Sequence, residues 1–151
     1  MKAVVALGAN LEIPEEAIEL ALGLLREATD VLGVSSFYKT KPVGGPPQPD
    51  YVNAVCILES DLPAMDLLHV LQGIEKSMGR VRTEQWGPRV IDLDLITYGE
   101  ILSKDNELTL PHPRAHERAF VLQPWLEIDP NAHLITHGAV SELLAHLPAG
   151  Q

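Results

Sequence analysis

Two strand–helix–strand patterns follow one another between residues 3 and 98, and they constrain the fold more than any other feature. In the first pattern, the apolar run at 3–7 precedes a helix that starts at Pro14, where proline and two acidic residues suit a first turn. Apolar residues then recur at helical spacing as far as Ala28. Gly33 is expected to end this helix, and residues 34–39 form the next expected strand.

The second pattern starts with residues 51–59, a run rich in strand-forming residues. A helix with Pro63 in its first turn follows, and Gly79 is expected to end it. Its predicted buried stripe consists of Leu67, Leu71, Ile74 and Met78. Residues 90–98 form the last strand. The order β-α-β-β-α-β predicts an α+β, ferredoxin-like fold, in which helices pack on an antiparallel sheet.

The remaining third of the chain predicts extra C-terminal helices. A short strand is expected at 108–110, a helix from Pro113 that Pro124 breaks or bends, and a short helix at 141–147. Residues 40–50 have no periodicity and contain four prolines and two glycines. A connection of this length in a small domain is often functional.

Length and charge narrow the class of protein. A chain of 151 residues fits a single domain over residues 1–151. The net charge of −10 argues against general binding to nucleic acid or to an anionic membrane. Cys56 is the sole cysteine, so no intrachain disulfide can form, and a buried apolar role is expected for it. Since no run has the length of a signal or membrane segment, we expect a cytoplasmic protein. We also expect a monomer.

The run at 90–96 carries two carboxylates, Asp92 and Asp94, in an apolar strand. Side chains two apart on a strand share a face, so these two like charges lie side by side and need an opposing charge. Mg²⁺ typically takes one or two carboxylates together with substrate phosphates. Arg80, Arg82 and Arg89 lie just upstream, and guanidinium groups suit phosphate. This favours phosphoryl-type transfer, although spacing alone fits exposed acids in surface ion pairs equally well.

Other motifs point away from several familiar sites. The chain lacks a P-loop motif, a G-x-G-x-x-G motif after the first strand, and a G-x-S-x-G motif. His112 and His116 are four apart, but Pro113 places His112 before the expected helix. A zinc site is therefore the weaker interpretation of this pair.

Eight short segments, in order along the chain, carry a resemblance to a known family. They are GANL (8–11), SSFYKT (35–40), QPDYVNA (48–54), RVR (80–82), WGPR (86–89), DLDLI (92–96), LPHP (110–113) and RAF (118–120). Together they resemble the 6-hydroxymethyl-7,8-dihydropterin pyrophosphokinases of folate biosynthesis, over nearly the whole chain. The resemblance implies a transferase that moves pyrophosphate from ATP to the hydroxymethyl group of the reduced pterin and releases AMP. It also implies two Mg²⁺ ions held by Asp92 and Asp94, with ATP as co-substrate.

The resemblance also implies roles for individual residues. The catalytic group would be Asp92 and Asp94 with Arg80, Arg82 and Arg89, of which Arg82 is the first choice for transition-state charge. The ATP site would use Gln72, Glu75, Trp86, Arg89, Thr109, His112 and Arg118. The pterin site would use Thr40, Pro42, Val43, Tyr51, Asn53 and Phe120.

Plain structural interpretations of several of these residues stay open. Tyr51 and Asn53 share a strand face, where a ring can stack on a heterocycle and an amide can bind its edge. However, Tyr51 and Phe120 also suit core packing. Gln72 and Glu75, three apart on a helix, also suit a solvated face. Trp86 suits a packing role as well.

Three departures from the family pattern affect the loops. Residues 41–47 are rich in proline, residues 83–85 carry no basic side chain, and Glu107 stands where a basic side chain is expected near the nucleotide. Two other function classes stay open: a non-catalytic ferredoxin-like module that binds nucleotide or metal, and a metal-dependent phosphohydrolase.

Overall fold

The computed structural model describes residues 1–41, 49–82 and 90–148, with residues 80–82 described by their backbone. The core elements are β1 (Lys2–Ala9), α1 (Pro14–Ala28), β2 (Asp30–Val34), β3 (Tyr38–Thr40), β4 (Tyr51–Glu59), α2 (Ala64–Arg82) and β5 (Asp92–Tyr98). They are followed by β6 (Ser103–Lys104), β7 (Thr109–Leu110), the 3-10 turn η1 (Ala115–Glu117), α3 (Ala119–Ile128), β8 (His133–Leu134), β9 (Gly138–Ala139) and α4 (Val140–Ala145).

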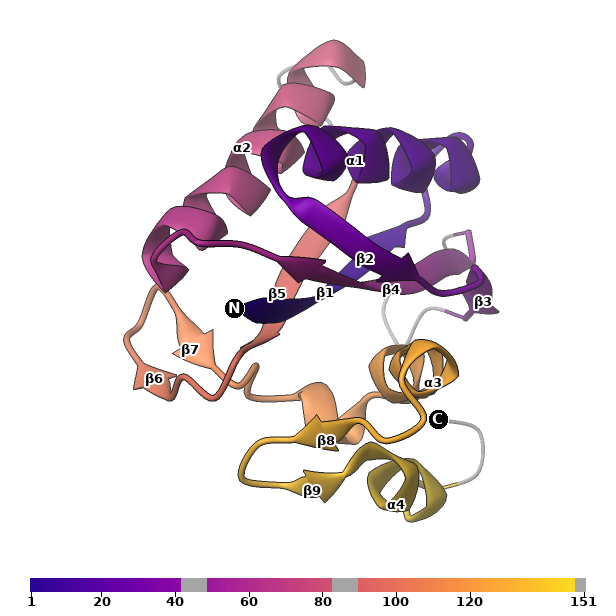
Figure 1. The fold of residues 1–151 in the computed structure, drawn as a ribbon. Coiled ribbons are helices and arrows are strands. Elements are labelled where there is room, and N and C mark those ends of the chain that lie inside the picture. The colour runs from indigo at the N-terminus through magenta and orange to yellow at the C-terminus, as the bar shows by residue number, and fades with distance from the viewer. Residues whose placement is uncertain (42–48, 83–89, 149–151) are drawn as a thin grey trace.

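The main sheet has the strand order β2-β4-β1-β5, and β3 pairs with β4 beyond the end of β2 (Figure 1). All of these pairings are antiparallel. β4, from the second strand–helix–strand unit, lies between the two strands of the first unit. The two units are therefore interleaved, which confirms the predicted ferredoxin-like α+β fold.

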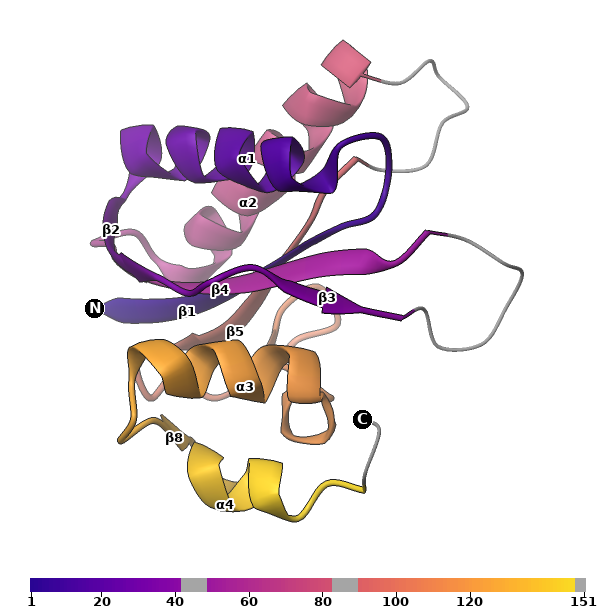
Figure 2. The same cartoon turned by 90° about the vertical axis from the view of Figure 1, so that its right-hand side faces the viewer.

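α1 and α2 cover one face of the sheet (Figure 2). Ile18, Leu22 and Leu25 of α1 are fully buried in one cluster with Leu7 of β1 and Leu71 of α2. These residues recur at the spacing of one helix face, so both predicted buried stripes are confirmed. This face supplies the larger part of the core.

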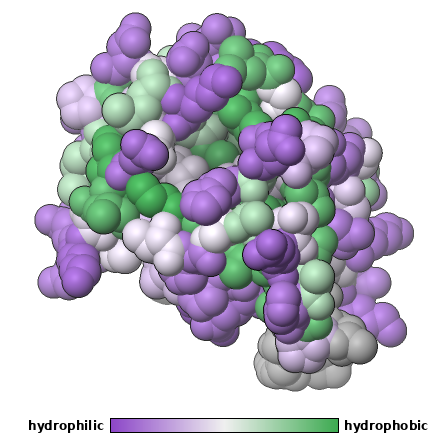
Figure 3. Space-filling view, turned by 60° about the horizontal axis from the view of Figure 1, so that its bottom comes forward, coloured by the Kyte–Doolittle hydropathy of each residue, from purple (hydrophilic) through white to green (hydrophobic). Residues whose placement is uncertain are grey.

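α3 and α4 lie on the opposite side of the sheet (Figure 2). Leu122 and Trp125 of α3 are buried against Val4 and Val55, which alternate along β1 and β4 with the residues of the first face. On the side where α4 lies, areas of apolar side chains are separated by hydrophilic ones (Figure 3). This second layer is thus apolar inside and mixed outside, and the prediction of extra C-terminal helices is confirmed.

Both predicted glycine stops were wrong. α1 already ends at Ala28, because Thr29 has an extended backbone; its N–H and its hydroxyl both donate to the Leu25 carbonyl at 2.8 Å. Gly33 lies inside β2, opposite Ile57. α2 continues through Gly79 because a single glycine costs a helix only about 1 kcal/mol, which packing of the stripe outweighs.

The strand expected at 34–39 is two strands, separated at Ser35. The Ser35 N–H donates to the Val55 carbonyl, and the Val55 N–H donates to the Ser35 hydroxyl, both at 2.9 Å. The Ser35 hydroxyl thus accepts the hydrogen bond that a backbone carbonyl accepts in a regular ladder. The next strand, β3, starts at Tyr38.

Prolines also behave differently from the prediction. Pro113 lies outside the helices, and α3 starts at Ala119. α3 runs through Pro124 as far as Ile128, because Leu122 and Trp125 on both sides of the proline are buried on the sheet.

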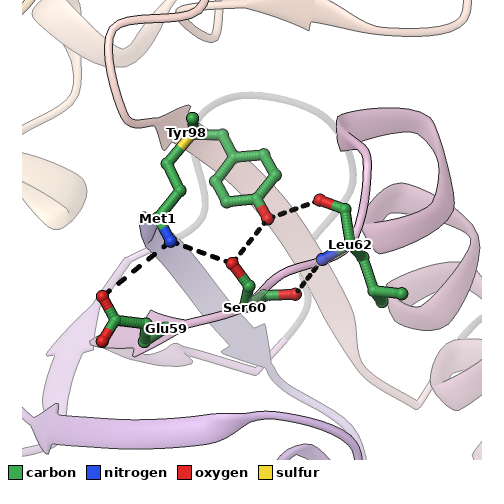
Figure 4. A network of polar contacts seen from close by, with 5 residues as sticks. All are labelled: Met1, Glu59, Ser60, Leu62 and Tyr98. Carbon is green, nitrogen blue, oxygen red and sulfur yellow. Dashed lines mark hydrogen bonds and ion pairs between the residues drawn. The ribbon is translucent and has the colours of Figure 1, made fainter.

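A polar network ties the sheet together at the end where β1 starts and β5 finishes (Figure 4). The Met1 amino group donates to the Ser60 carbonyl at 3.0 Å and lies 3.8 Å from the Glu59 carboxylate. The Tyr98 hydroxyl contacts the carbonyls of Ser60 at 3.1 Å and Leu62 at 2.6 Å. These contacts lie at the end of the sheet away from Asp92, which is at the other end of β5.

Two further features of the structure concern Cys56 and the length and polarity of the helices. Cys56 is fully buried in β4, and burial raises the pKa of its thiol to about 12, which confirms an apolar packing role. Among the described residues, the helices are too short or too polar to cross a membrane.

Candidate active site

Several of the predicted site residues lie at one end of the main sheet. β1 finishes there at Ala9, β3 finishes at Thr40, and β4 and β5 begin there at Tyr51 and Asp92. Asn10, just after β1, donates through its side-chain amide to the Pro49 carbonyl at 3.2 Å. This bond holds the chain entering β4 against the end of β1.

Asp92 and Asp94 are half-buried and lie opposite Gly8 and Ala6 of β1. Their side chains share the sheet face that α3 covers, while Leu93 between them points into the core on the other face. The Leu93 N–H donates to Glu75 Oε2 of α2 at 2.8 Å. Glu75 is therefore bound to the strand between the two aspartates, and the solvated-face interpretation does not hold for it.

A glycine separates the predicted metal pair from the predicted pterin pocket. Gly8 pairs with Asn53 on one side and with Asp92 on the other, so the three residues form one row across the sheet. A Cβ atom at Gly8 would lie 3.1 Å from Asn53 Oδ1. A side chain at Gly8 would therefore crowd the Asn53 amide.

Three of the predicted pterin residues are neighbours across two strands. Thr40 of β3 lies opposite Tyr51 of β4, and the buried Asn53 amide donates to Thr40 Oγ1 at 2.6 Å. Phe120, half-buried at the start of α3, has the Arg118 guanidinium 5.5 Å from its ring centre. Pro42 and Val43 lie outside the described residues.

His112 lies near Asp94 of the predicted metal pair. Its backbone N–H donates to the Ile96 carbonyl at 2.8 Å, and its Nδ1 accepts from the Arg114 N–H at 3.2 Å. Burial lowers the pKa of His112; the Asp94 carboxylate acts in the opposite direction, and the Arg118 guanidinium lowers the pKa further. The imidazole is therefore neutral at neutral pH, with its proton on Nε2.

The other predicted ATP residues are spread around this centre. Gln72 is exposed on α2, one turn before Glu75, and exposed Thr109 donates to the Asp105 carbonyl at 3.2 Å. Arg80 and Arg82 lie in the last turn of α2, and Trp86 and Arg89 lie outside the described residues. Glu107, where a basic side chain was expected, contacts His69 of α2 at 3.1 Å.

The donor set suits magnesium better than zinc. Two half-buried carboxylates on one strand match the few protein ligands that Mg²⁺ takes when phosphates and waters supply the rest. Within residues 1–41, 49–82 and 90–148, there is no group of three or more His, Cys, Asp or Glu side chains that could together hold a metal ion. His112 is bonded to β5, whereas the His116 ring stacks on His137 with centres 4.2 Å apart.

Two supporting residues had no assigned role in the sequence. Gly8 belongs to the GANL segment, but only the strand register shows that it separates Asn53 from Asp92. Glu127 of α3 binds Ser36 and Tyr38, and no sequence spacing links residues so far apart. The SSFYKT segment was the only signal for this second contact.

Comparisons with known proteins identify relatives of this chain. Residues 4–130 match the family model described as 7,8-dihydro-6-hydroxymethylpterin-pyrophosphokinase. The chain is 44% identical over 141 residues to the 2-amino-4-hydroxy-6-hydroxymethyldihydropteridine pyrophosphokinase of Haemophilus influenzae, covering 89% of this chain and 88% of that protein. It is 42% identical over 146 residues to the Pseudomonas aeruginosa protein of the same name, covering 95% and 90%.

Solved structures share the fold at low identity. The wild-type HPPK-DHPS of Plasmodium falciparum superposes with a TM-score of 0.73 at 14% identity, over 95% of this chain. The match covers 40% of that longer chain. The family model matches residues 4–130 of this chain, and two relatives are more than 40% identical to it. This chain therefore belongs to the 7,8-dihydro-6-hydroxymethylpterin-pyrophosphokinase family.

Proposed function

We propose that this chain transfers the β,γ-pyrophosphoryl group of ATP to 6-hydroxymethyl-7,8-dihydropterin at the end of the sheet where Asn53, Gly8 and Asp92 form a row. In this reaction the pterin hydroxymethyl oxygen bonds to the β-phosphorus, the bond from that phosphorus to the α-phosphate oxygen breaks, and AMP leaves. The hydroxyl proton passes to solvent. Family membership supports the reaction, and the row across the sheet is the observation that carries the placement.

Asp92 and Asp94 would hold Mg²⁺, and we propose two ions. When bound, Mg²⁺ offsets the negative charge of the phosphates. The two carboxylates suit this role because they lie next to each other, half-buried, on a strand whose backbone Glu75 and β1 fix in place. A rigid strand is a better support for such ligands than a loop.

The pterin would lie against β3 and β4, on the side of Gly8 away from Asp92. Tyr51 and Phe120 would pack on its ring, and Asn53 would bind its polar edge. The Asn53 Oδ1 faces Gly8, while its amide N–H is used by Thr40, which fixes the orientation of the side chain. Pro42 and Val43 are proposed to complete this pocket.

The phosphates would lie between Asp94 and the basic residues. A neutral His112 can donate through Nε2 to a phosphate oxygen without adding positive charge. Arg80, Arg82 and Arg89 are proposed to stabilise the charge of the transferring group, with Arg82 acting in the transition state. Catalysis then consists mostly of positioning and charge stabilisation.

The remaining ATP contacts are proposed for Gln72, Glu75, Trp86, Thr109 and Arg118. Glu107 is not among them, because it lies against His69. The prediction that nucleotide contacts here differ from the family pattern remains a prediction.

The test is analysis of the nucleotide product with ATP, Mg²⁺ and 6-hydroxymethyl-7,8-dihydropterin. AMP that forms only when pterin and Mg²⁺ are both present supports the proposal. ADP, or phosphate released without pterin, would instead point to transfer of a single phosphoryl group. ATP binding without turnover would point to a binding module.

A further inference from the structure

Glu127 accepts hydrogen bonds from two residues that lie about 90 positions earlier in the chain. This exposed side chain lies near the end of α3. Its carboxylate accepts from the Ser36 N–H at 3.0 and 3.1 Å, from the Ser36 hydroxyl at 2.8 Å and from the Tyr38 hydroxyl at 2.6 Å. A single exposed bond contributes little, but three donors around one carboxylate define a fixed contact.

One donor, Tyr38, begins β3, the strand that forms one wall of the proposed pterin pocket, and Ser36 lies two residues before it. Tyr38 lies opposite Asn53, and Thr40, two residues further along β3, binds the Asn53 amide. Tyr38 and Thr40 therefore point to the same face as Asn53. A shift of β3 would move Thr40 and release the Asn53 side chain.

The acceptor belongs to the helix that forms the opposite wall. α3 carries Phe120 in its first turn and Glu127 in its last turn, and it packs on β4 through Leu122 and Trp125. One carboxylate thus ties the helix that bears Phe120 to the strand that bears Thr40. The directions of the pKa shifts agree with a formed contact, since the Tyr38 bond lowers the pKa of Glu127 and raises that of Tyr38.

We propose that Glu127 is a positioning residue for the pterin substrate, which sets the distance between Phe120 on α3 and Thr40 with Asn53 on the sheet. This inference rests on the proposed function, because it takes the space between these residues as the pterin pocket. It assigns no contact between Glu127 and the substrate or the phosphates. The effect of Glu127 therefore falls on the binding of pterin and spares that of ATP.

The experiment compares the wild type with Glu127→Ala, Glu127→Gln and Tyr38→Phe. For each protein, KM for pterin, KM for ATP and kcat are measured by AMP formation, and Tm is measured without substrates. We expect Glu127→Ala to raise the KM for pterin about tenfold, with KM for ATP and kcat within about twofold of wild type. Glu127→Gln keeps one acceptor oxygen and should recover part of the loss.

The matched control is Gln123→Ala, one turn earlier on the same helix and also exposed. It should leave all three constants unchanged. Amide hydrogen exchange at residues 38–40 of the substrate-free protein gives a readout that does not depend on turnover, and it should become faster in Glu127→Ala but not in Gln123→Ala.

Several results would overturn the inference. An unchanged KM for pterin in both Glu127 variants would do so, as would an equal rise in the KM values of pterin and ATP. If Glu127→Ala does not fold, Glu127→Gln and Tyr38→Phe still decide the question. If the wild type itself forms no AMP, the proposed function fails, whereas the exchange result still shows whether Glu127 holds β3.

Discussion

The two faces of the central sheet are built in different ways. Along β1, Val5 and Leu7 point towards α1 and α2 and are fully buried in one apolar cluster. The alternate residues Ala6 and Gly8 point towards α3, and beside them on β5 lie Asp94 and Asp92. The first face is apolar over its length, whereas the second is apolar under the helices and polar at the end beyond them. The alternation of side chains thus gives the sheet one apolar face and one face that combines an apolar cluster with the proposed site.

The largest expected effect is the loss of turnover when a carboxylate is removed from the α3 face. Asp92→Ala and Asp94→Ala should each lower turnover by about 1,000-fold, because each removes a proposed ligand for the charge on the phosphates. Tm should change little, since both side chains are half-buried and add no apolar packing.

Asp61→Ala is the control for that loss, because Asp61 is exposed at the other end of the sheet and should keep full activity. AMP formation and circular dichroism measure the two effects. Near-wild-type turnover in either aspartate variant would remove the metal assignment.

On the other face, a core substitution should lower stability and leave turnover unchanged. Leu22→Ala leaves a cavity under α1, where Leu22 is 1% exposed, and should cost about 3 kcal/mol of unfolding free energy. Urea unfolding measures this loss, and the kcat of the folded protein should stay unchanged. Leu20→Ala is the matched control on the same helix: Leu20 is 47% exposed, so its loss should be below about 0.5 kcal/mol. Equal losses in the two variants would contradict the assigned core.

A methyl group at Gly8 tests the boundary between the metal pair and the pterin pocket. Gly8→Ala should raise the KM for pterin by about fivefold, because the new Cβ displaces Asn53 Oδ1 from its 3.1 Å position. In Gly23→Ala, on α1, the new Cβ meets nothing within 4 Å and should stabilise the protein by about 0.5–1 kcal/mol. An unchanged KM in Gly8→Ala would show that the row is not used by the substrate.

The smallest effect concerns pH and the contact between α3 and β3. The pKa of Glu127 is lowered from 4.5, so its contribution to stability is present above about pH 4.5 and is lost as pH falls through the folded pKa. The pKa of Tyr38 is raised from 10.0, so its contribution is present below about pH 10 and is lost as pH rises through the folded pKa. The difference in Tm between wild type and Glu127→Ala should therefore be largest near neutral pH. A difference that is constant from acid to alkaline pH would contradict this contact.

Much of the first face could be predicted from the sequence. Strand β4 has the predicted bounds, Tyr51 to Glu59, and the stripe from Leu67 to Met78 is buried as predicted, with Ile74 the most exposed of its members at 8%. The shared face of Asp92 and Asp94 was also predicted. These features depend on periods of two and 3.6 residues, which are local properties of the chain.

Element ends and site partners could not be predicted in the same way. Gly33 and Gly79 suggested ends of helices and Pro124 a break or bend, but packing and strand pairing override such local preferences by a few kcal/mol. The ATP and pterin roles of all the named site residues remain predictions, and Trp86, Arg89, Pro42 and Val43 also lie outside the described part of the chain.

By itself, the sequence determined the main helices and strands of the two strand–helix–strand units, the family resemblance and the candidate residues for the chemistry. Only the tertiary structure decided that Asn53, Gly8 and Asp92 form a row, because that row needs β1 to lie between β4 and β5, the two strands of the other unit. It alone placed Glu127 on Ser36 and Tyr38. Periodicity acts over a few neighbouring residues, whereas strand order and contacts between distant residues come from the packing of the whole chain.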